Sequence, residues 1–500
     1  MLNIRKAFSN KFYEVNQNIE KNEKLLSEMF LKLASLENNI NNLENNINNL
    51  ENNINNLSSQ KWLDDKFNEI FRELSEINQL KQEMSNNEFL LKESLSNSYK
   101  IIGEFKYTNL EYLNLKNIVD NTRKNVLLIG FYGAPNLGDE LMLETMIEKI
   151  ELLGNFNITV MLSENIDYDI TKLPKCNIIH FPKNLLDINT LADCFDVFIF
   201  GGGAIIDDYQ YPVDYQMSLG QILVNLTLRA ITYNKKVLLY GLSSNASFND
   251  EEYLQKLRLI SKGNIEFSLR DSNSLETLKK YKINTDNIKV VHDIVLANRN
   301  LNLANKNKNS EKIKLGIIYI CSENNYSKLI EITKQTISIM DNNNYDYEIN
   351  FIPFYNYLNN DTKYYQKIID EVDLKKLNLK KFPNNFQEII NVLNEQDIIL
   401  SMRYHGTLLA GILNKKVINL IFDEHRHYKN KCNYLKDNYK INDVTLNFSE
   451  LSFEKLEKGL LSTIKNKKKK YDYTQILREA DEQIDKSLSS VLLEVNDDKN

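Results

Sequence analysis

Arg403 and His405 lie two residues apart, just after a short apolar run at 397–400. In an extended segment, side chains at this spacing share one face of the chain. A guanidinium can bind a carboxylate or phosphate through two parallel hydrogen bonds, and a histidine beside it can transfer a proton near neutral pH. We therefore predict that the pair binds an acidic ligand and acts on it. The alternative is a purely structural histidine, which is the commoner use of a single His.

Arg270 has a similar placement, because it follows the apolar run 267–269 and precedes a predicted helix at 274–280. The local alternative to a binding role is a salt bridge with Asp271 or Glu276.

A glycine-containing segment, 130–140, follows a predicted buried strand and opens a predicted helix. Glycines such as Gly133 and Gly138 let the backbone approach a ligand, and a helix N-terminus attracts anions. Asn136 and Asp139 lie in the same segment. Asp139 is either a functional carboxylate or the N-cap of the helix, which is the commoner role of an Asp in this position.

Three adjacent glycines, Gly201, Gly202 and Gly203, follow another predicted strand in a chain that contains only 15 glycines. A tight turn alone seldom needs three glycines. The sequence leaves two interpretations open, a demanding turn and a loop whose backbone touches a substrate.

From residue 125 onward, short apolar runs alternate with helical patterns. We expect the apolar runs to be strands of sheets that position the four segments described above. This alternation is typical of parallel strands covered by helices on both faces. The expected strands are 126–130, 158–162, 197–200, 237–241 and 288–291 in a first series and 315–320, 347–353, 397–400 and 417–422 in a second. A polar stretch without a period, 298–312, separates the two series.

We therefore predict two Rossmann-like α/β domains with a linker between them. The predicted boundaries are 120–300 for the first domain, 301–312 for the linker, 313–450 for the second domain and 451–500 for a helical tail. Open sheets of this kind bind ligands at the carboxyl ends of their strands, which is where the segments described above occur.

A different pattern fills the first part of the chain. Residues 36–57 repeat Leu-Glu-Asn-Asn-Ile-Asn-Asn, with Ile at heptad position a and Leu at position d. This combination favours a parallel two-stranded coiled coil. We predict a helical arm at 1–110 that joins two chains into a homodimer. The alternative is an Asn-rich low-complexity stretch that is partly disordered.

Composition excludes several classes of protein. The 500 residues carry a net charge of −6, which argues against general nucleic-acid binding. Four cysteines without a close pair offer neither a disulfide framework nor a zinc cluster. His425 and His427 lie near Asp423 but lack a third well-placed ligand, so we expect no metal site.

The chain also lacks the roughly 20 uncharged residues that a membrane-spanning helix requires. We expect a cytoplasmic protein, with peripheral association at the inner face of the membrane as a further option.

Several motifs in a fixed order make the chain resemble the polysaccharide pyruvyl transferase family. They are the segment 130–140, the loop Gly201-Gly202-Gly203, Ser268-Leu269-Arg270-Asp271 before Ser274, Asp293 after a valine-rich run, and Met402-Arg403-Tyr404-His405-Gly406. The resemblance covers residues 125–430 approximately. The chain departs from the usual family pattern at Tyr404, where leucine is common, and in the His-rich segment 423–429.

The resemblance implies a two-domain fold similar to glycosyltransferase-B enzymes. It also implies that phosphoenolpyruvate is the donor, with no further cofactor, and that its pyruvyl group is placed as a ketal on two hydroxyls of a sugar or lipid-linked glycan. Arg270 and Arg403 would hold the two acidic groups of the donor, His405 would be the general acid, and Asp139 would position or deprotonate an acceptor hydroxyl. Two alternatives remain: a nucleotide-sugar-dependent glycosyltransferase of the same layout, and a non-catalytic coiled-coil scaffold.

Overall fold

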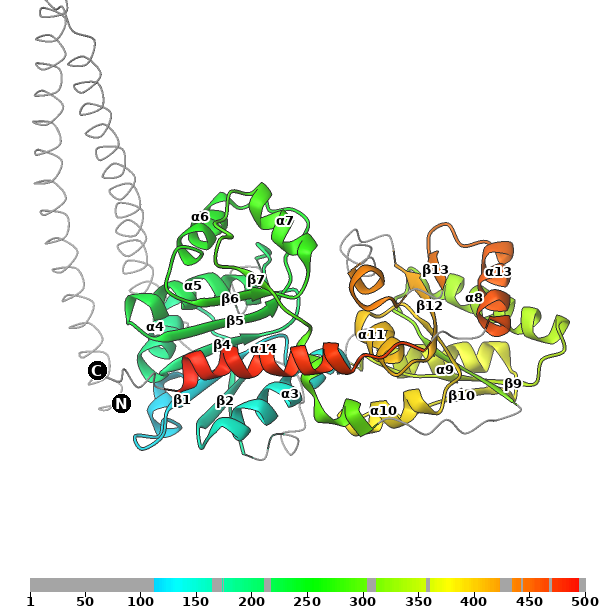
Figure 1. Ribbon diagram of the computed structural model, residues 1–500, viewed down its shortest axis with the longest axis horizontal. Coiled ribbons are helices and arrows are strands. Elements are labelled where there is room, and N and C mark those ends of the chain that lie inside the picture. Colours follow the sequence, from blue (N-terminus) through cyan, green and yellow to red (C-terminus); the bar gives the residue numbers. More distant parts are fainter. Residues whose placement is uncertain are drawn as a thin grey trace, which may run out of the picture. The chain divides into compact units, whose positions relative to one another are not determined.

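The computed structural model describes residues 112–163, 173, 175–210, 217–303, 312–356, 360–422, 434–441, 444–466 and 470–493 (Figure 1). The predicted coiled-coil arm at 1–110 lies outside the described residues, as do His425 and His427. The dimer that the arm predicts therefore stays a prediction.

The first α/β domain contains a seven-stranded sheet in which every pair of neighbours is parallel. Its spatial order is β3 (Asn177–His180), β2 (Asn157–Leu162), β1 (Asn125–Ile129), β4 (Val197–Gly201), β5 (Lys236–Leu242), β6 (Glu266–Leu269) and β7 (Lys289–Val290). Its helices are α3 (Leu137–Leu153), α4 (Leu185–Cys194), α5 (Leu219–Thr232), α6 (Glu251–Ile260) and α7 (Ser272–Lys280). A short 3-10 helix, η2 (Tyr112–Asn117), precedes β1. All residues of β1, β2 and β4 are buried, as expected for apolar strands covered on both faces.

The second domain repeats this order in a six-stranded parallel sheet. The strands are β10 (Leu377–Leu379), β9 (Tyr347–Phe351), β8 (Ile313–Ile318), β11 (Ile398–Ser401), β12 (Lys416–Ile421) and β13 (Val444–Asn447). The helices are α8 (Tyr326–Asn342), α9 (Asp361–Val372), α10 (Phe386–Asn394), α11 (Tyr404–Ile412) and α13 (Phe453–Lys465). The prediction of two parallel α/β sheets is confirmed.

The strand order determines where a ligand can enter. In each sheet the chain starts at a central strand, moves to one edge, and then returns to the other side of the starting strand. The reversal lies between β1 and β4 in the first sheet and between β8 and β11 in the second. The loops that leave two such strands diverge and open a crevice at their carboxyl ends.

The sequence did not reveal the edge strands β3, β10 and β13. Each is short and only partly buried, so its residues show neither a continuous apolar run nor a clean alternation.

The polar stretch 298–312 begins as ordered structure. Short 3-10 helices occupy Ile294–Ala297 (η4) and Arg299–Leu303 (η5). Asn298, between them, is buried and its side-chain amide donates to Thr145 Oγ1 of α3 at 3.1 Å. Asn298 is thus a buried, hydrogen-bonded residue although it opens a polar stretch, of which residues 304–311 lie outside the described residues.

The two helices of the predicted tail pack against different domains. Helix α13 packs on α8, β12 and β13, whereas α14 (Thr474–Leu492) runs back to the first domain and contacts β5, α3 and η4 (Figure 1). Lys149 of α3 forms ion pairs with Asp481 and Asp485 of α14, the latter at 3.0 Å. The last described helix is thus part of the first domain's packing.

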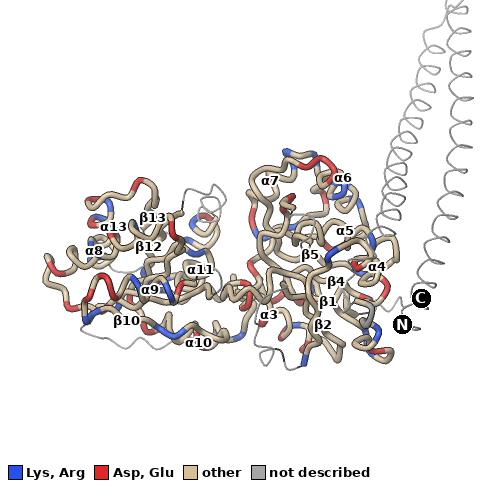
Figure 2. Tube along the Cα trace, turned by 180° about the vertical axis from the view of Figure 1, so that it is seen from behind, with Lys and Arg blue, Asp and Glu red and all other residues tan. Residues whose placement is uncertain are grey.

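Acidic and basic residues are interspersed along the trace of both domains (Figure 2). Among the described residues, no helix combines the length and apolar character needed to cross a bilayer.

Candidate functional site

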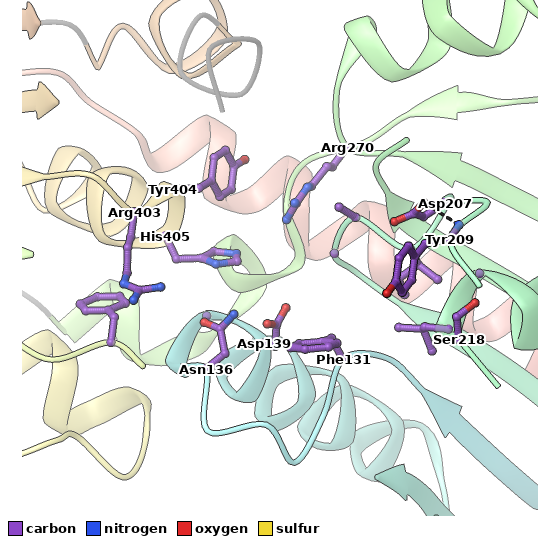
Figure 3. Close-up of a pocket in the computed structure, with 17 residues that line it drawn as sticks. Phe131, Asn136, Asp139, Asp207, Tyr209, Ser218, Arg270, Arg403, Tyr404 and His405 are labelled. Atoms are coloured by element: carbon purple, nitrogen blue, oxygen red, sulfur yellow. Dashed lines mark hydrogen bonds between the residues drawn. The ribbon is translucent and has the colours of Figure 1, made fainter. Parts of the chain in front are cut away.

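A pocket of about 330 Å³ lies at the carboxyl ends of the strands and is lined by residues of both α/β domains (Figure 3). Its charged side chains come from segments that follow β4, β6 and β11 and from the first turn of α3. The charged or titratable lining residues are Asp139, Asp207, Tyr209, Arg270, Arg403, Tyr404 and His405. The sequence-predicted residues Arg270, Arg403, His405 and Asp139 are therefore brought together in one pocket.

Arg270 follows β6 directly, and its side chain is only 4% exposed. Its Nη1 lies 2.9 Å from Asp293 Oδ2, and its Nε donates to Ser243 Oγ at 2.8 Å. The guanidinium carbon lies 4.8 Å from the centroid of the Tyr404 ring, a cation–π contact. These contacts hold the guanidinium in one orientation at the pocket wall.

The local alternative for Arg270, a salt bridge with Asp271 or Glu276, is wrong. Asp271 caps α7 by accepting from the backbone N–H of Ser274 at 2.7 Å. Glu276 pairs with Lys279 at 3.0 Å.

Arg403 stands between β11 and α11, as the residue that precedes the helix. Its Nη2 lies 2.8 Å from Asp361 Oδ1, and its Nε donates to the carbonyl oxygen of Tyr319 at 3.2 Å. Asp361 also accepts from the backbone N–H groups of Phe354 and Tyr355 at 2.9 and 2.8 Å. Its carboxylate is fully buried and connects Arg403 to the segment that follows β9.

His405 belongs to the first turn of α11, so it does not share an extended strand with Arg403 as the sequence suggested. The strand ends at Ser401, and the start of the helix turns both side chains into the pocket. His405 Nε2 lies 3.4 Å from Asp293 Oδ2, the same oxygen that pairs with Arg270. Asp293 thus lies between a guanidinium of the first domain and an imidazole of the second.

The charge state of Asp293 follows from these neighbours. Burial alone would raise the pKa of its carboxyl, but the imidazole of His405 and the guanidinium of Arg270 outweigh burial and hold this pKa well below its ordinary range. Asp293 is therefore an anion at neutral pH.

Asp139 is the third residue of α3, and the N-cap position belongs to Asn136. The N-cap alternative for Asp139 is therefore wrong. Asp139 is 8% exposed to solvent, and it lines the pocket. Gly138 lies against His405, because a Cβ atom added to Gly138 would overlap the imidazole Nδ1. The first turn of α3 consequently needs glycine where it meets the histidine of the other domain.

The loop before α3 is tied to the second domain by its backbone. Leu137 N–H donates to the carbonyl of Phe354 at 2.8 Å, and Asn356 N–H donates to the carbonyl of Pro135 at 2.9 Å. Gly133 has a φ of 83°, and its N–H donates to Glu140 Oε1 at 2.9 Å. Gly133 therefore shapes this loop, while Asn136 and Gly138 line the pocket.

The three glycines after β4 have different roles. Gly202 and Gly203 have φ values of 67° and 86°, which favour glycine. A Cβ atom on Gly202 would overlap Met142 Sδ, and the carbonyl of Gly201 accepts from the buried Tyr132 hydroxyl at 2.8 Å. Of the three, Gly203 lines the pocket. Packing accounts for Gly201, where an added Cβ atom would lie 2.6 Å from the Tyr132 hydroxyl oxygen. Packing and positive φ account for Gly202, and positive φ accounts for Gly203.

Three helices begin at the pocket: α3 through Asn136 and Gly138, α5 through Ser218 and Leu219, and α11 through Arg403 and Tyr404. Helix N-termini carry partial positive charge and unpaired N–H groups, which suit phosphate and carboxylate. Together with Arg403, the N-termini of α3 and α11 make their side of the pocket suited to an anionic group. Among the described residues, no group of three His, Cys, Asp or Glu could hold a metal ion.

Sequence reasoning missed the carboxylates that orient the arginines. Asp293 belonged to a recognised motif but had no assigned role, and Asp361 gave no local signal, because it lies 42 residues from Arg403 in sequence. The aromatic residues Phe131 and Tyr209 were missed as well, since a single aromatic residue near a strand end is usually part of the core.

Fold and pocket together define a class: a two-domain α/β protein that gathers two arginines and a histidine at the carboxyl ends of its strands. The family model for polysaccharide pyruvyl transferase matches residues 136–424, which is more than half of the chain. The chain belongs to this family, and the resemblance predicted from the motifs is confirmed.

Comparison with solved structures finds matches at low sequence identity. UDP-GlcNAc 2-epimerase from Methanocaldococcus jannaschii is 14% identical, with a TM-score of 0.47 over 72% of this chain and 98% of that one. UDP-GlcNAc 2-epimerase from Neisseria meningitidis is 13% identical, with a TM-score of 0.43 over 74% and 99%. MurG from Acinetobacter baumannii is 11% identical, with a TM-score of 0.44 over 74% and 99%. Comparison with curated proteins found no match.

Proposed function

We propose that this protein transfers the pyruvyl group of phosphoenolpyruvate onto two hydroxyls of one sugar in a cell-surface polysaccharide or its precursor. The product is a pyruvate ketal, and inorganic phosphate is released. The observation that carries the proposal is the convergence of Arg270, Arg403 and His405 on one pocket at which three helices begin.

The donor matches this arrangement in charge. Phosphoenolpyruvate carries a carboxylate and a phosphate, and a guanidinium is suited to bidentate contact with either group. Asp293 and Asp361 each engage one edge of an arginine and thereby orient its planar group. The N-termini of α3 and α11, on the side of the pocket that holds Arg403 and His405, supply further N–H donors for the phosphate oxygens.

The chemistry requires a proton at the methylene carbon of the donor. That carbon becomes a methyl group, and the oxygen of the first hydroxyl bonds to the carbon that carries the phosphate. The second hydroxyl oxygen then replaces the phosphate, whose bond to carbon breaks with the electron pair leaving on oxygen. Of the two hydroxyl protons, one ends in the methyl group and the other on phosphate, so the reaction is balanced.

His405 is the residue we assign to the first proton transfer. Its Nε2 lies 3.4 Å from Asp293 Oδ2, so this carboxylate can orient the imidazole, and the histidine regains its proton from the acceptor. Asp139 is the residue we assign to the acceptor, as the carboxylate that orients or deprotonates an attacking hydroxyl. It lies on the pocket wall near Gly203, where an added Cβ atom would stand 3.7 Å from Asp139 Oδ1.

The test is an assay of phosphate release from phosphoenolpyruvate with a panel of sugars and lipid-linked glycans, followed by mass analysis of the product. The proposal expects a product whose mass is that of the acceptor plus one pyruvic acid minus one water, together with calorimetric binding of phosphoenolpyruvate. Binding of a nucleotide sugar in place of phosphoenolpyruvate would favour a glycosyltransferase. A protein that binds neither donor would favour a scaffold.

A further inference from the structure

Two large aromatic side chains are exposed at the pocket. Phe131 is 40% exposed and Tyr209 is 58% exposed, and both line the cavity. An apolar surface that stays exposed loses about 25 cal/mol of favourable burial free energy for each Å². A concentration of exposed aromatic side chains at a cavity therefore indicates a binding role. Figure 3 shows both rings toward the same end of the pocket as Asp207 and Ser218, away from Arg403 and His405.

The local structure positions the backbone segments that carry these rings. Tyr132 turns inward and is 1% exposed, with its hydroxyl bonded to Gly201, so the preceding Phe131 turns outward. The backbone N–H of Tyr209 donates to Asp207 Oδ1 at 2.9 Å. Asp207 is itself fixed, because its N–H donates to the hydroxyl of the buried Tyr253 at 3.1 Å.

The start of α5 completes this end of the pocket. Gly220 allows close packing there, since a Cβ atom on it would overlap the carbonyl oxygen of Asp207. Ser218, the N-cap of α5, lines the cavity beside it. The aromatic end is therefore built from the loop after β1, the loop after β4 and the N-terminus of α5.

Charge differs between the two ends. Arg403 and His405 lie at one end of the pocket, Arg270 and Asp139 lie near the middle, and Asp207 lies at the aromatic end (Figure 3). An aromatic ring packs well against the C–H face of a sugar, and a carboxylate accepts hydrogen bonds from sugar hydroxyls. A carboxylate on the sugar would face a like charge at this end and lose affinity.

Size supports two ligands in one cavity. Pockets of about 300 Å³ or more hold drug-sized ligands, and phosphoenolpyruvate is much smaller than these. A donor held by the arginines leaves the aromatic end of the 330 Å³ cavity for a sugar ring.

We infer that Phe131 and Tyr209, with Asp207, form the acceptor subsite, and that this subsite takes an uncharged pyranose in preference to an acidic sugar. The inference rests on the proposed function, and it adds the position and the chemical class of the acceptor. In this arrangement Asp139 lies between the sugar and the donor. It is therefore placed beside the sugar hydroxyl that attacks the donor carbon.

The experiment uses the full chain and the methyl glycosides of glucose, galactose, mannose and N-acetylglucosamine, together with the methyl glycosides of glucuronic and galacturonic acid. Binding is measured by saturation-transfer NMR in the presence of phosphoenolpyruvate, and donor affinity is measured separately by calorimetry. F131A and Y209A are each expected to weaken binding of the neutral glycosides about tenfold. Y209F keeps the ring and should bind as the wild type does.

The control variant is L152A, which removes an exposed apolar side chain on α3 outside the pocket and should change nothing. Donor affinity should be the same in the wild type and in all five variants, D207N included. The wild type should bind neutral glycosides more tightly than uronides. In D207N the ratio of these two affinities should be smaller, because one negative charge is removed from the subsite.

The inference is overturned if F131A and Y209A bind the neutral glycosides as well as the wild type does. It is also overturned if the wild type binds uronides as tightly as neutral sugars. The third contrary result is a wild type that binds phosphoenolpyruvate but none of the neutral glycosides. Failure of the wild type to bind phosphoenolpyruvate overturns the proposed function instead. The donor titration therefore separates the two failures.

Discussion

The loops after β4 and β11 occupy the same topological place in two sheets of the same strand order, yet they contribute different chemistry. Each follows the strand beside the point at which the chain order reverses. The loop after β4 presents Gly203 and no charged side chain until Asp207, whereas the segment after β11 presents Arg403 and His405 at once. Topology thus determines where a ligand can bind, and the residues at that place determine which ligand it is.

The same contrast extends over the pocket. Among the lining residues, the second domain supplies Arg403 and His405, and the first supplies the carboxylates Asp139 and Asp207 and the close-packed backbone at Gly203. Arg270 is the exception, because it belongs to the first domain but shares Asp293 with His405 of the second. This shared carboxylate links the donor-binding and proton-transfer roles that we assign to the two domains.

The largest expected effect comes from His405→Gln, which removes the proposed proton donor. General acids contribute about 10²–10⁴-fold to rate, so turnover should fall by that factor while donor affinity changes little. Steady-state kinetics and calorimetry measure the two quantities. Near-normal turnover with weakened donor binding would assign His405 to the phosphate clamp, and the acid would then be sought among Asp139, Asp293, His425 and His427.

A substitution in the first domain tests whether the position of His405 matters. In Gly138→Ala the added Cβ overlaps the imidazole Nδ1 and displaces the ring. A misplacement of about 1 Å can lower rate by about 10²-fold, so we expect a loss of that order in turnover. Gly154→Ala, at the other end of α3, is the control, because its Cβ meets only the Phe156 ring at 3.2 Å. Unchanged turnover in Gly138→Ala would argue against a catalytic His405.

The arginines are expected to act on binding. Hydrogen bonds to charged groups contribute about 1.5–3 kcal/mol, so Arg403→Ala and Arg270→Ala should each weaken phosphoenolpyruvate binding by about 10- to 150-fold. Lysine at either position would keep the charge but lose the bidentate geometry, giving an intermediate result. Calorimetric titration decides the question. Unchanged donor affinity in both alanine variants would make the arginines structural.

The Asp293→Asn variant tests the carboxylate that is shared by Arg270 and His405, and the measured quantity is the thermal stability of the protein. Since the pKa of Asp293 is lowered in the folded protein, the ionised carboxylate stabilises the fold above its unfolded pKa of about 3.9. This stabilisation is lost as the pH falls through the lowered pKa. Thermal unfolding between pH 7 and pH 3 should show a less stable variant at pH 7 and a shallower acid dependence than in the wild type. Parallel curves would contradict the assigned charge state.

The smallest effect on catalysis is expected from deletion of residues 1–100. The pocket is built from residues after 130, so turnover per chain should be unchanged. If the heptads at 36–57 form a dimer, light scattering should show half as many chains per particle after the deletion. The same number of chains per particle would assign oligomerisation to another part of the chain.

The sequence alone determined the two parallel sheets and the central strands, because buried parallel strands need continuous apolar runs that are visible in any single segment. It also predicted Arg270, Arg403, His405 and Asp139, since charged or ionisable residues directly after such runs lie at the edge where ligands bind. The short edge strands were not visible, because partial burial leaves no regular pattern.

Only the tertiary structure decided how these residues act together. Asp293 and Asp361 acquire their partners across 23 and 42 residues of chain, and the fit of Gly138 against His405 joins two domains. The pairing of Phe131 with Tyr209 at one end of the pocket also depends on two separate loops. Such contacts depend on distance in space, which the folded sheets determine, and no local pattern of residue types encodes them.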